Sequence, residues 1–347
     1  MNSFPPFSSS RDFTMSTLQA SLELYQKLPV LVNEKACSGK VYIVTGSNTG
    51  LGLETARHLV HASAGRVILA VRNVAAGEKA KVDIEKSSPA KGVIDVWPLD
   101  LASFSSIHTF AQKVTGLDRL DCLISNAGVM MDKWTTSEGL ETSVTVNVIG
   151  TMLLGALVMP ILARSGGKYS GDGEKPRLVF VVSTLGFQSK KEMNKSVNGV
   201  IFEGLNDHKR ADMDKRYGVT KLVEMFAVRQ FASLYPVTQT GVIINMTAPG
   251  LCSTGLGHDA RTLTRAWVNA ARAMMARTAE EGSRAILFGA VASEESHGKL
   301  LAGCKIKDYW VPDWVTSKDG QQLQEKIWAE LAGRLEETSP GCLSQIG

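Results

Sequence analysis

Short runs of apolar residues alternate along this chain with longer segments in which apolar residues recur at helical spacing. The apolar runs predict strands at residues 41–45, 66–71, 93–99, 120–125, 177–182 and 242–246. The segments between them predict helices at 51–63, 75–87, 103–115, 138–163 and 212–235. Because these strands do not alternate in polarity, we expect both of their faces to be buried by helices. The pattern is typical of an α/β fold with a doubly wound parallel sheet and helices on both faces.

Three segments lie outside this alternation. Residues 1–38 are an N-terminal extension, and residues 187–211 form a polar insertion between a strand and the next helix. Residues 306–347 form a C-terminal extension, in which 321–335 has the charged, amphipathic pattern of one further helix. The alternating unit therefore spans residues 39–305 as a single domain, although a length of 347 residues alone would allow two domains.

Charge and cysteine content exclude several classes of function. Lysine and arginine exceed aspartate and glutamate by only 38 to 34, without clustering, so no nucleic-acid footprint is expected. The cysteines are odd in number, far apart and without metal-ligand spacing, which predicts no metal site and favours a reducing, cytoplasmic location. The longest apolar stretch, 144–163, is interrupted by Thr145, Asn147, Thr151 and Pro160, which favours a buried helix over a membrane span.

The first predicted strand leads directly into a glycine-rich turn. The turn reads Thr45-Gly46-Ser47-Asn48-Thr49-Gly50-Leu51-Gly52, and the first predicted helix begins near its end. Glycines at such a position let the backbone approach a dinucleotide pyrophosphate, whose charge is favoured at a helix N-terminus. A tight turn that serves only helix packing is the alternative. The place of the turn, after the first strand of a doubly wound sheet, favours the nucleotide site of a Rossmann-type fold.

The spacing Gly-x-x-x-Gly-x-Gly resembles the first turn of the short-chain dehydrogenase/reductase family, and further landmarks of that family follow in order. They are Asp100, Asn126-Ala127-Gly128, Asn147, Ser183, Tyr217-x-x-x-Lys221 and Pro249-Gly250. The resemblance covers roughly residues 39–305. The long segment between Ser183 and Tyr217 is similar to that of a longer subgroup, which includes retinol dehydrogenases and many fungal reductases.

The end of the second predicted strand bears on the choice of cofactor. NAD-dependent enzymes of this fold place a carboxylate there, whereas the strand of this chain is followed by Arg72 and Asn73. A guanidinium binds phosphate through a planar fork of donors, so Arg72 is the candidate for a 2'-phosphate, assisted by Asn73 or Ser47. An ordinary surface arginine is the alternative. NADP(H) is therefore expected in preference to NAD(H).

Tyr217 and Lys221 are four residues apart on a predicted helix and hence on one face of it. A nearby ammonium favours the phenolate and so lowers the pKa of a tyrosine from its usual value near about 10. The resemblance implies that Tyr217 is the general acid/base, that Lys221 lowers its pKa and binds the nicotinamide ribose, and that Ser183 polarises the carbonyl. Thr184 is the alternative hydroxyl. Asn147 is implied to hold a water that links the lysine to solvent, and a core amide bonded to backbone is the other interpretation.

The resemblance also implies the remaining cofactor contacts. They are the turn from Gly46 to Gly52, Asp100 and Leu101 beside the adenine, Asn126, Ala127 and Gly128 along the cofactor, and Pro249, Gly250 and Thr254 beside the nicotinamide. Residues 255–277 are expected to form a helical lid that decides substrate specificity. Apolar side chains that could face a substrate, with core packing as the alternative, are Met130, Met131, Trp134, Phe187, Met152 and Leu256.

Together these features predict an NADPH-dependent oxidoreductase that interconverts a carbonyl and an alcohol on a small, apolar substrate, in fungal secondary-metabolite biosynthesis. Two alternatives keep the fold: an enzyme with a non-redox biosynthetic role, and a protein that only senses NAD(P). The presence of Ser183, Tyr217 and Lys221 together argues against the sensor. The identity of the substrate and the formation of a homodimer are left open by the sequence.

Overall fold

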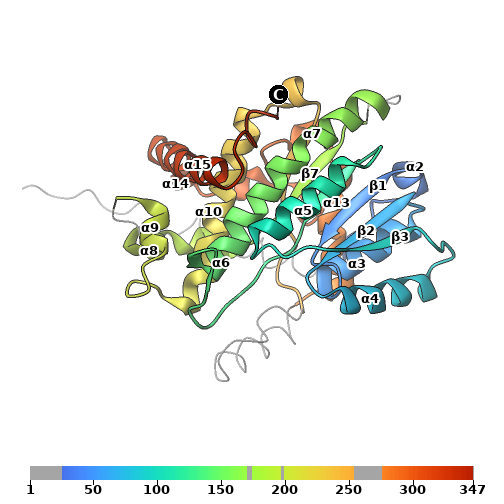
Figure 1. Cartoon of the computed structure of the whole chain (residues 1–347), viewed down its shortest axis with the longest axis horizontal. Coiled ribbons are helices and arrows are strands. Elements are labelled where there is room, and N and C mark those ends of the chain that lie inside the picture. Colours follow the sequence, from blue (N-terminus) through green and yellow to red (C-terminus); the bar gives the residue numbers. More distant parts are fainter. Residues whose placement is uncertain (1–25, 170–173, 197–198, 254–275, 347) are drawn as a thin grey trace, which may run out of the picture.

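The computed structural model describes residues 26–169, 174–196, 199–253 and 276–346. Its centre is an eight-stranded sheet with the order β10-β9-β8-β7-β4-β1-β2-β3 (Figure 1). The strands are β1 (Val41–Thr45), β2 (Arg66–Val71), β3 (Ile94–Pro98), β4 (Cys122–Ser125), β7 (Arg177–Val181), β8 (Ile243–Ala248), β9 (Leu300–Ala302) and β10 (Lys305–Ile306). Neighbouring strands are parallel apart from β9 and β10, which are antiparallel. The doubly wound α/β fold is confirmed, and β9 and β10 are additions to the predicted strands.

Each face of the sheet is covered by helices (Figure 1). The helices on one face are α3 (Gly50–His61), α4 (Val74–Ser87) and α13 (Ala279–Val291), and those on the other are α5 (Phe104–Thr115), α7 (Thr151–Tyr169) and α10 (Met213–Leu234). In β1 the side chains of Tyr42 and Val44 pack with the first group, whereas that of Ile43 packs with the second. Successive strand residues therefore enter two separate cores, which explains why the strands are mostly apolar and do not alternate in polarity.

The long apolar helix begins later than the predicted residue 138. Residues Thr136–Ser137 (β5) and Leu140–Glu141 (β6) pair as a short hairpin, and both Glu138 and Gly139 between them have positive φ angles, which a right-handed helix excludes. The helix starts with α6 (Thr142–Val144), continues as the π-helical η1 (Thr145–Gly150) and ends with α7.

The helix formed by α6, η1 and α7 is long and apolar enough to cross a membrane by length and composition alone. However, 83% of its most apolar window is buried inside the protein. Gly155 illustrates the close packing, because an added Cβ there would lie 3.1 Å from the ring of Phe180 on β7. The expected buried helix is therefore confirmed.

The described part of the polar insertion at 187–211 folds into short helices. After η2 (Thr184–Ser189) come α8 (Lys190–Ser196) and α9 (Ile201–Leu205). The apolar side chains buried in this segment are those of Met193, Ile201, Phe202 and Leu205. The carboxylate of Glu330 caps α9 by accepting hydrogen bonds from the backbone amides of Ile201 at 2.8 Å and Phe202 at 3.1 Å. The polar composition concealed this packing because the capping group lies 129 residues away along the chain.

The predicted C-terminal helix is present as α15 (Lys318–Thr338), preceded by α14 (Asp313–Thr316). It lies beside α10 (Figure 1), and the ring of Trp328 is 5.5 Å from that of Phe231 on α10. The side chains of Ile327 and Leu331 are fully buried in the same core as α10 and one face of the sheet. The helix is therefore part of one domain and not an appendage.

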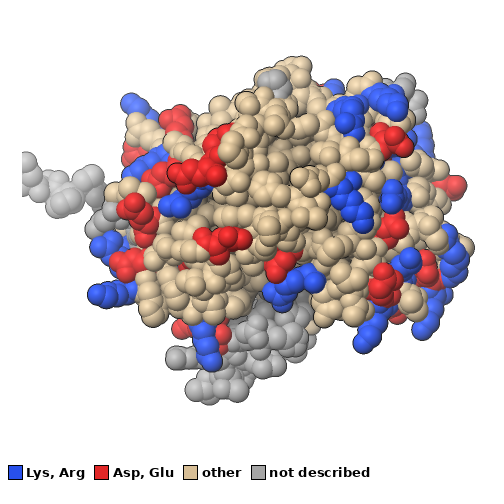
Figure 2. All heavy atoms as spheres, in the orientation of Figure 1, with Lys and Arg blue, Asp and Glu red and all other residues tan. Residues whose placement is uncertain are grey.

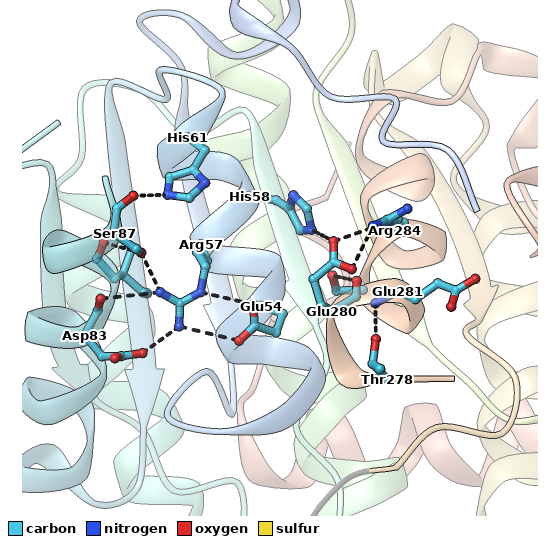
Figure 3. Close-up of polar contacts among 12 residues, drawn as sticks. Glu54, Arg57, His58, His61, Asp83, Ser87, Thr278, Glu280, Glu281 and Arg284 are labelled. Carbon is cyan, nitrogen blue, oxygen red and sulfur yellow. Dashed lines mark hydrogen bonds and ion pairs between the residues drawn. The ribbon is translucent and has the colours of Figure 1, made fainter. Parts of the chain in front are cut away.

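Polar contacts fasten α3 to the helices on either side of it (Figure 3). Towards α4, Arg57 Nη2 donates a hydrogen bond of 2.6 Å to Asp83 Oδ2. Towards α13, His58 Nε2 lies 2.8 Å from Glu280 Oε1, and Glu280 also accepts hydrogen bonds from Arg284. On the face of the molecule in Figure 2, lysine and arginine are interspersed with aspartate and glutamate.

Other short elements complete the described chain. They are α2 (Glu34–Cys37), α11 (Val237–Thr240), η3 (Glu294–Ser296) and η4 (Asp308–Trp310). The chain before α2 contacts α13, because the Leu28 amide donates to Glu281 Oε1 at 3.2 Å. The five cysteines are all free and buried.

Candidate active site

A cleft of about 370 Å³ opens at the carboxyl ends of the central strands, where α/β proteins of this type bind ligands. The predicted site residues that line it are Gly46, Asn48, Thr49, Gly50, Leu51, Gly52, Arg72, Asp100, Leu101, Asn126, Ala127, Gly128, Ser183, Tyr217, Lys221, Pro249 and Gly250. The structure therefore brings most of the predicted set together from six separate strand ends and from α10. Thr254 lies outside the described residues.

The glycine turn passes so close to the next strand end that side chains have no room. Gly46 has a φ of 64°, and an added Cβ would lie 3.1 Å from the Cα of Ala127. At Gly52 a Cβ would lie 2.6 Å from the Gly46 carbonyl oxygen and 2.6 Å from Asn126 Nδ2. The turn is thus a narrow backbone cradle in the sense expected of a dinucleotide site.

Thr45 at the end of β1 ties this cradle to the end of β4. Its hydroxyl accepts hydrogen bonds from the backbone amides of Asn126 at 2.9 Å and Ala127 at 2.8 Å. In return, Asn126 Nδ2 donates to the Thr45 carbonyl at 2.8 Å. Sequence reasoning did not assign a site role to Thr45, although its place directly before the glycine turn was visible.

The N-terminus of α3 fits an anionic group. The side chain of the N-cap residue Thr49 accepts no hydrogen bond from the first amides of this 12-residue helix. These amides can therefore donate to another acceptor. These amides and the positive end of the helix dipole favour a phosphate, which can approach over Gly50 and Gly52. The residues present therefore fit the pyrophosphate of a nicotinamide dinucleotide.

Arg72 follows β2 and lines the cleft with its guanidinium-bearing side chain exposed. The two residues expected to assist it are engaged elsewhere. Asn73 Oδ1 accepts a 3.0 Å hydrogen bond from the Ala76 amide and so caps α4, and the buried Ser47 hydroxyl donates at 2.7 Å to the Val44 carbonyl. Neither residue lines the cleft in the part of the chain that the structure describes.

Ser183, Tyr217 and Lys221 lie at the other end of the same cleft. Ser183 follows β7, and its hydroxyl accepts a 3.3 Å hydrogen bond from the Leu185 amide as the N-cap of η2. Thr184, the alternative hydroxyl, does not line the cleft. Because α10 packs closely on η2, Tyr217 and Lys221 line the same cleft as the serine.

Lys221 is almost fully buried and its ammonium is held by two acceptors. Nζ donates to the Val181 carbonyl at 2.8 Å and to Glu224 Oε2 at 2.7 Å. Burial favours the neutral amine, but the negative charge of Glu224 and the nearby Tyr217 outweigh burial and raise the pKa of Lys221. The lysine thus stays an ammonium that is electrostatically coupled to the tyrosine.

Asn147 is fully buried within the π-helical turn η1 and stands behind the cleft instead of lining it. Its Oδ1 accepts from the Val129 amide at 2.8 Å, and its Nδ2 donates to the Val129 carbonyl at 2.8 Å and to Thr220 Oγ1 at 3.0 Å. These bonds satisfy the hydrogen-bonding groups of the amide in the core, which agrees with the interpretation of Asn147 as a core amide bonded to backbone. A π-turn at this point agrees with the frequent occurrence of such turns at functional sites.

Known proteins were compared with the whole chain. A family model described as short chain dehydrogenase matches residues 40–195. The short chain dehydrogenase/reductase dmxR8 of Cryptosporiopsis sp. (strain 8999) is 37% identical over 328 residues, which cover 93% of this chain and 98% of that protein. The short chain dehydrogenase atnD of Emericella nidulans is 38% identical over 285 residues, covering 80% of this chain and 87% of that protein. This chain belongs to the short-chain dehydrogenase/reductase family.

Solved structures of other proteins share its fold. The short-chain dehydrogenase from Sphingobium yanoikuyae in complex with NADPH has a TM-score of 0.56 at 18% identity, covering 76% of this chain and 87% of that one. An uncharacterized protein from Mycobacterium paratuberculosis has a TM-score of 0.61 at 22% identity, covering 88% and 97% of the two chains. These likenesses confirm the Rossmann-type sheet of this family member.

The substrate end of this short-chain dehydrogenase/reductase is partly described. Met130 lines the cleft, whereas Met152 is fully buried in the core, in agreement with the alternative of core packing. The ring of Trp134 lies 5.0 Å from that of His208, away from the lining residues. Leu256 and most of the expected lid at 255–277 lie outside the described residues. Further apolar lining residues that sequence reasoning missed are Val146, Leu185 and Leu251.

Glu224 is a further residue that sequence reasoning missed. It lies three residues after Lys221 on α10, and its side chain is 1% exposed. A carboxylate at this spacing in an otherwise apolar helical segment was the available signal, since buried charges occur almost only in pairs. The signal could have suggested the ion pair but not its burial.

Proposed function

We propose that this protein is an NADPH-dependent reductase that interconverts a carbonyl and an alcohol on a small, apolar substrate. Its family membership establishes an oxidoreductase of the short-chain type. The observation that carries the finer proposal is the convergence of Ser183, Tyr217 and Lys221 in one cleft with the glycine cradle. A hydroxyl, a phenol and an ammonium at the end of a dinucleotide site can bind a carbonyl oxygen and deliver a proton to it.

In the proposed reaction the chain itself handles the proton. When bound, the cofactor supplies a hydride from its nicotinamide ring. Tyr217 donates its phenolic proton to the carbonyl oxygen of the substrate, and the Ser183 hydroxyl donates a hydrogen bond to the same oxygen. Lys221 stabilises the phenolate that Tyr217 leaves behind, because its ammonium carries the opposite charge. Asn147 supports this end of the site by holding the backbone of Val129, which lines the cleft.

NADP(H) is proposed over NAD(H) because of Arg72. The side chain lies in the cleft at the end of β2, where NAD-dependent enzymes of this fold place a carboxylate. A guanidinium at this point can bind a 2'-phosphate with two parallel hydrogen bonds. The NADPH complex of the related Sphingobium enzyme supports the same choice.

The biological setting is proposed from the relatives and the cleft. Relatives at 30% identity or more come from fungi such as Emericella nidulans and Penicillium roqueforti, which supports a fungal biosynthetic role. Met130, Val146 and Leu185 give the substrate end an apolar lining, which suits a substrate with a hydrocarbon skeleton. Free, buried cysteines support a reducing location such as the cytoplasm.

The acid role is tested with Tyr217→Phe, which removes the proton and leaves the ring. We expect kcat/KM for carbonyl reduction to fall by about 10²- to 10⁴-fold. Absorbance of NADPH is followed with a panel of polyketide, terpenoid and retinoid carbonyls. Tyr309→Phe is the matched control, since that side chain is 74% exposed and does not line the cleft. Undiminished reduction by Tyr217→Phe would refute the acid role, and NADPH binding without any turnover in the wild type would indicate a sensor.

The cofactor choice is tested with Arg72→Glu. Charge repulsion against the 2'-phosphate should weaken NADPH binding by about tenfold or more, while NADH binding changes little. Lys305→Glu, an exposed charge reversal on β10 at the opposite edge of the sheet, is the control. Equal losses for both cofactors in Arg72→Glu would contradict the assignment.

A further inference from the structure

Three residues of α10 project from one face of the helix towards the end of β7. Tyr217, Lys221 and Glu224 occupy positions i, i+4 and i+7, which lie one above another on a helix. The side chains of Lys221 and Glu224 are 5% and 1% exposed, and Nζ lies 2.7 Å from Oε2. The carboxylate therefore contacts the ammonium directly, within the buried part of this helix face.

The surroundings of this ion pair contain few other charges. From β7 the Val181 carbonyl accepts from Nζ, and the neutral amide of Asn147 on η1 donates to the hydroxyl of the neighbouring Thr220. Among the described residues, the charge that acts on Glu224 is that of Lys221. Burial raises the pKa of Glu224, and its lysine partner opposes this effect.

The second buried ion pair of α10 belongs to another environment. Arg216 Nε lies 3.5 Å from Glu141 Oε2, and both side chains are buried. Glu141 also caps α6 through the amides of Ser143 and Val144, so its role in the fold is clear. Glu224 makes no such cap among the described residues, and it pairs with the lysine of the candidate active site.

We propose that Glu224 is a positioning residue that holds the ammonium of Lys221 and offsets its charge, so that Tyr217 keeps its proton to higher pH than Lys221 alone would allow. This inference rests on the proposed function, because it concerns the acid of that reaction. In a site of low dielectric an unbalanced ammonium would strongly favour the phenolate, which cannot donate a proton. The counter-charge therefore keeps the proton-donating form of Tyr217 populated near neutral pH.

The decisive experiment is a titration that needs no substrate. Ultraviolet absorbance of tyrosinate is measured against pH for the wild type and Glu224→Gln, with Tyr217→Phe subtracted to isolate the signal of Tyr217. Glutamine keeps the size and a hydrogen-bond acceptor but removes the charge. We expect the midpoint of Tyr217 to fall by about one pH unit, because removal of the carboxylate leaves the ammonium of Lys221 unbalanced, and an unbalanced opposite charge at close range shifts a titration by about one unit or more.

Glu141→Gln is the matched control, because it neutralises the other buried carboxylate paired with a cation of α10. We expect this variant to lower thermal stability without moving the midpoint of Tyr217. A purely structural role of Glu224 predicts the same outcome for Glu224→Gln, namely lower stability and an unchanged midpoint, and that result would overturn the proposal. An equal shift in both variants would overturn it as well.

Glu224→Asp provides a second variant for the case that Glu224→Gln does not fold. The carboxylate is kept but withdrawn from Nζ by one methylene, so a smaller shift of the same sign is expected. A midpoint equal to or above that of the wild type would then decide against the proposal. Failure of the proposed function has a different signature, since it abolishes NADPH turnover in the wild type while the tyrosinate titrations still report on Glu224.

Discussion

Replacing Gly52 by alanine would place a methyl group inside the contact between the glycine turn and the end of β4. The added Cβ would lie 2.6 Å from the Gly46 carbonyl oxygen and 2.6 Å from Asn126 Nδ2, whereas ordinary contacts of carbon lie near about 3.5 Å. The two backbones must therefore separate by roughly 1 Å, and overpacking of this kind costs about 1–3 kcal/mol.

The same displacement moves the amides of α3 relative to Arg72 and the rest of the cleft. If the binding energy falls by a similar amount, the dissociation constant of NADPH rises by about 5- to 150-fold. Fluorescence of bound NADPH measures the affinity, and thermal unfolding followed by circular dichroism shows that the variant is folded at the assay temperature. We also expect a decrease in Tm on the order of 2–10 °C.

Gly333→Ala is the matched control for this substitution. Gly333 is exposed on α15, and an added Cβ there meets nothing within 4 Å. Alanine in a helix is better than glycine by about 0.5–1 kcal/mol, so this variant should unfold at a slightly higher temperature and bind NADPH normally. Wild-type NADPH affinity and Tm in Gly52→Ala would refute the argument that the turn needs a residue without a side chain.

Two further predictions concern stability. His58 is 16% exposed, and burial lowers its pKa below the usual value near 6.5, so the folded state binds fewer protons than the unfolded state and stability is lost as pH falls below that value. His58→Gln should show a smaller decrease of the urea unfolding midpoint between about pH 7.5 and 5.5. An identical decrease in the variant and the wild type would contradict this reasoning. Leu331→Ala, at a fully buried position of α15, should cost about 2–5 kcal/mol in urea unfolding. Leu234→Ala, at a position that is 44% exposed, is the control and should lower the free energy of unfolding much less. Equal losses in the two variants would contradict the inference that Leu331 of α15 belongs to the hydrophobic core.

The strands and most helices could be predicted closely because their signals are local. The strand at 41–45 is found at Val41–Thr45 and that at 66–71 at Arg66–Val71. The start of the long helix was wrong by four residues, since the prediction began at 138 and the structure begins at Thr142. Left-handed backbone at Glu138 and Gly139 ends any helix there, and a glutamate gives little sign of such a conformation.

The candidate site could be predicted wherever a residue type and its spacing carry the chemistry. Tyr217 and Lys221 are examples, because four residues along a helix place two side chains together in any tertiary setting. The expected assistance of Ser47 and Asn73 at the 2'-phosphate depends instead on where each side chain points. The Ser47 hydroxyl is hydrogen-bonded to the backbone of its own strand, and the Asn73 side chain caps α4. Both side chains are thus held by nearby backbone groups.

The sequence by itself determined the alternation of strands and helices, the glycine turn and the family, since each of these depends on the spacing of residues along the chain. Only the tertiary structure decided that Glu330 caps α9 and that the Lys221–Glu224 pair is buried. Burial is set by the packing of segments far apart in sequence, and it converts a pair of charges that is common on surfaces into a buried pair whose lysine is electrostatically coupled to Tyr217.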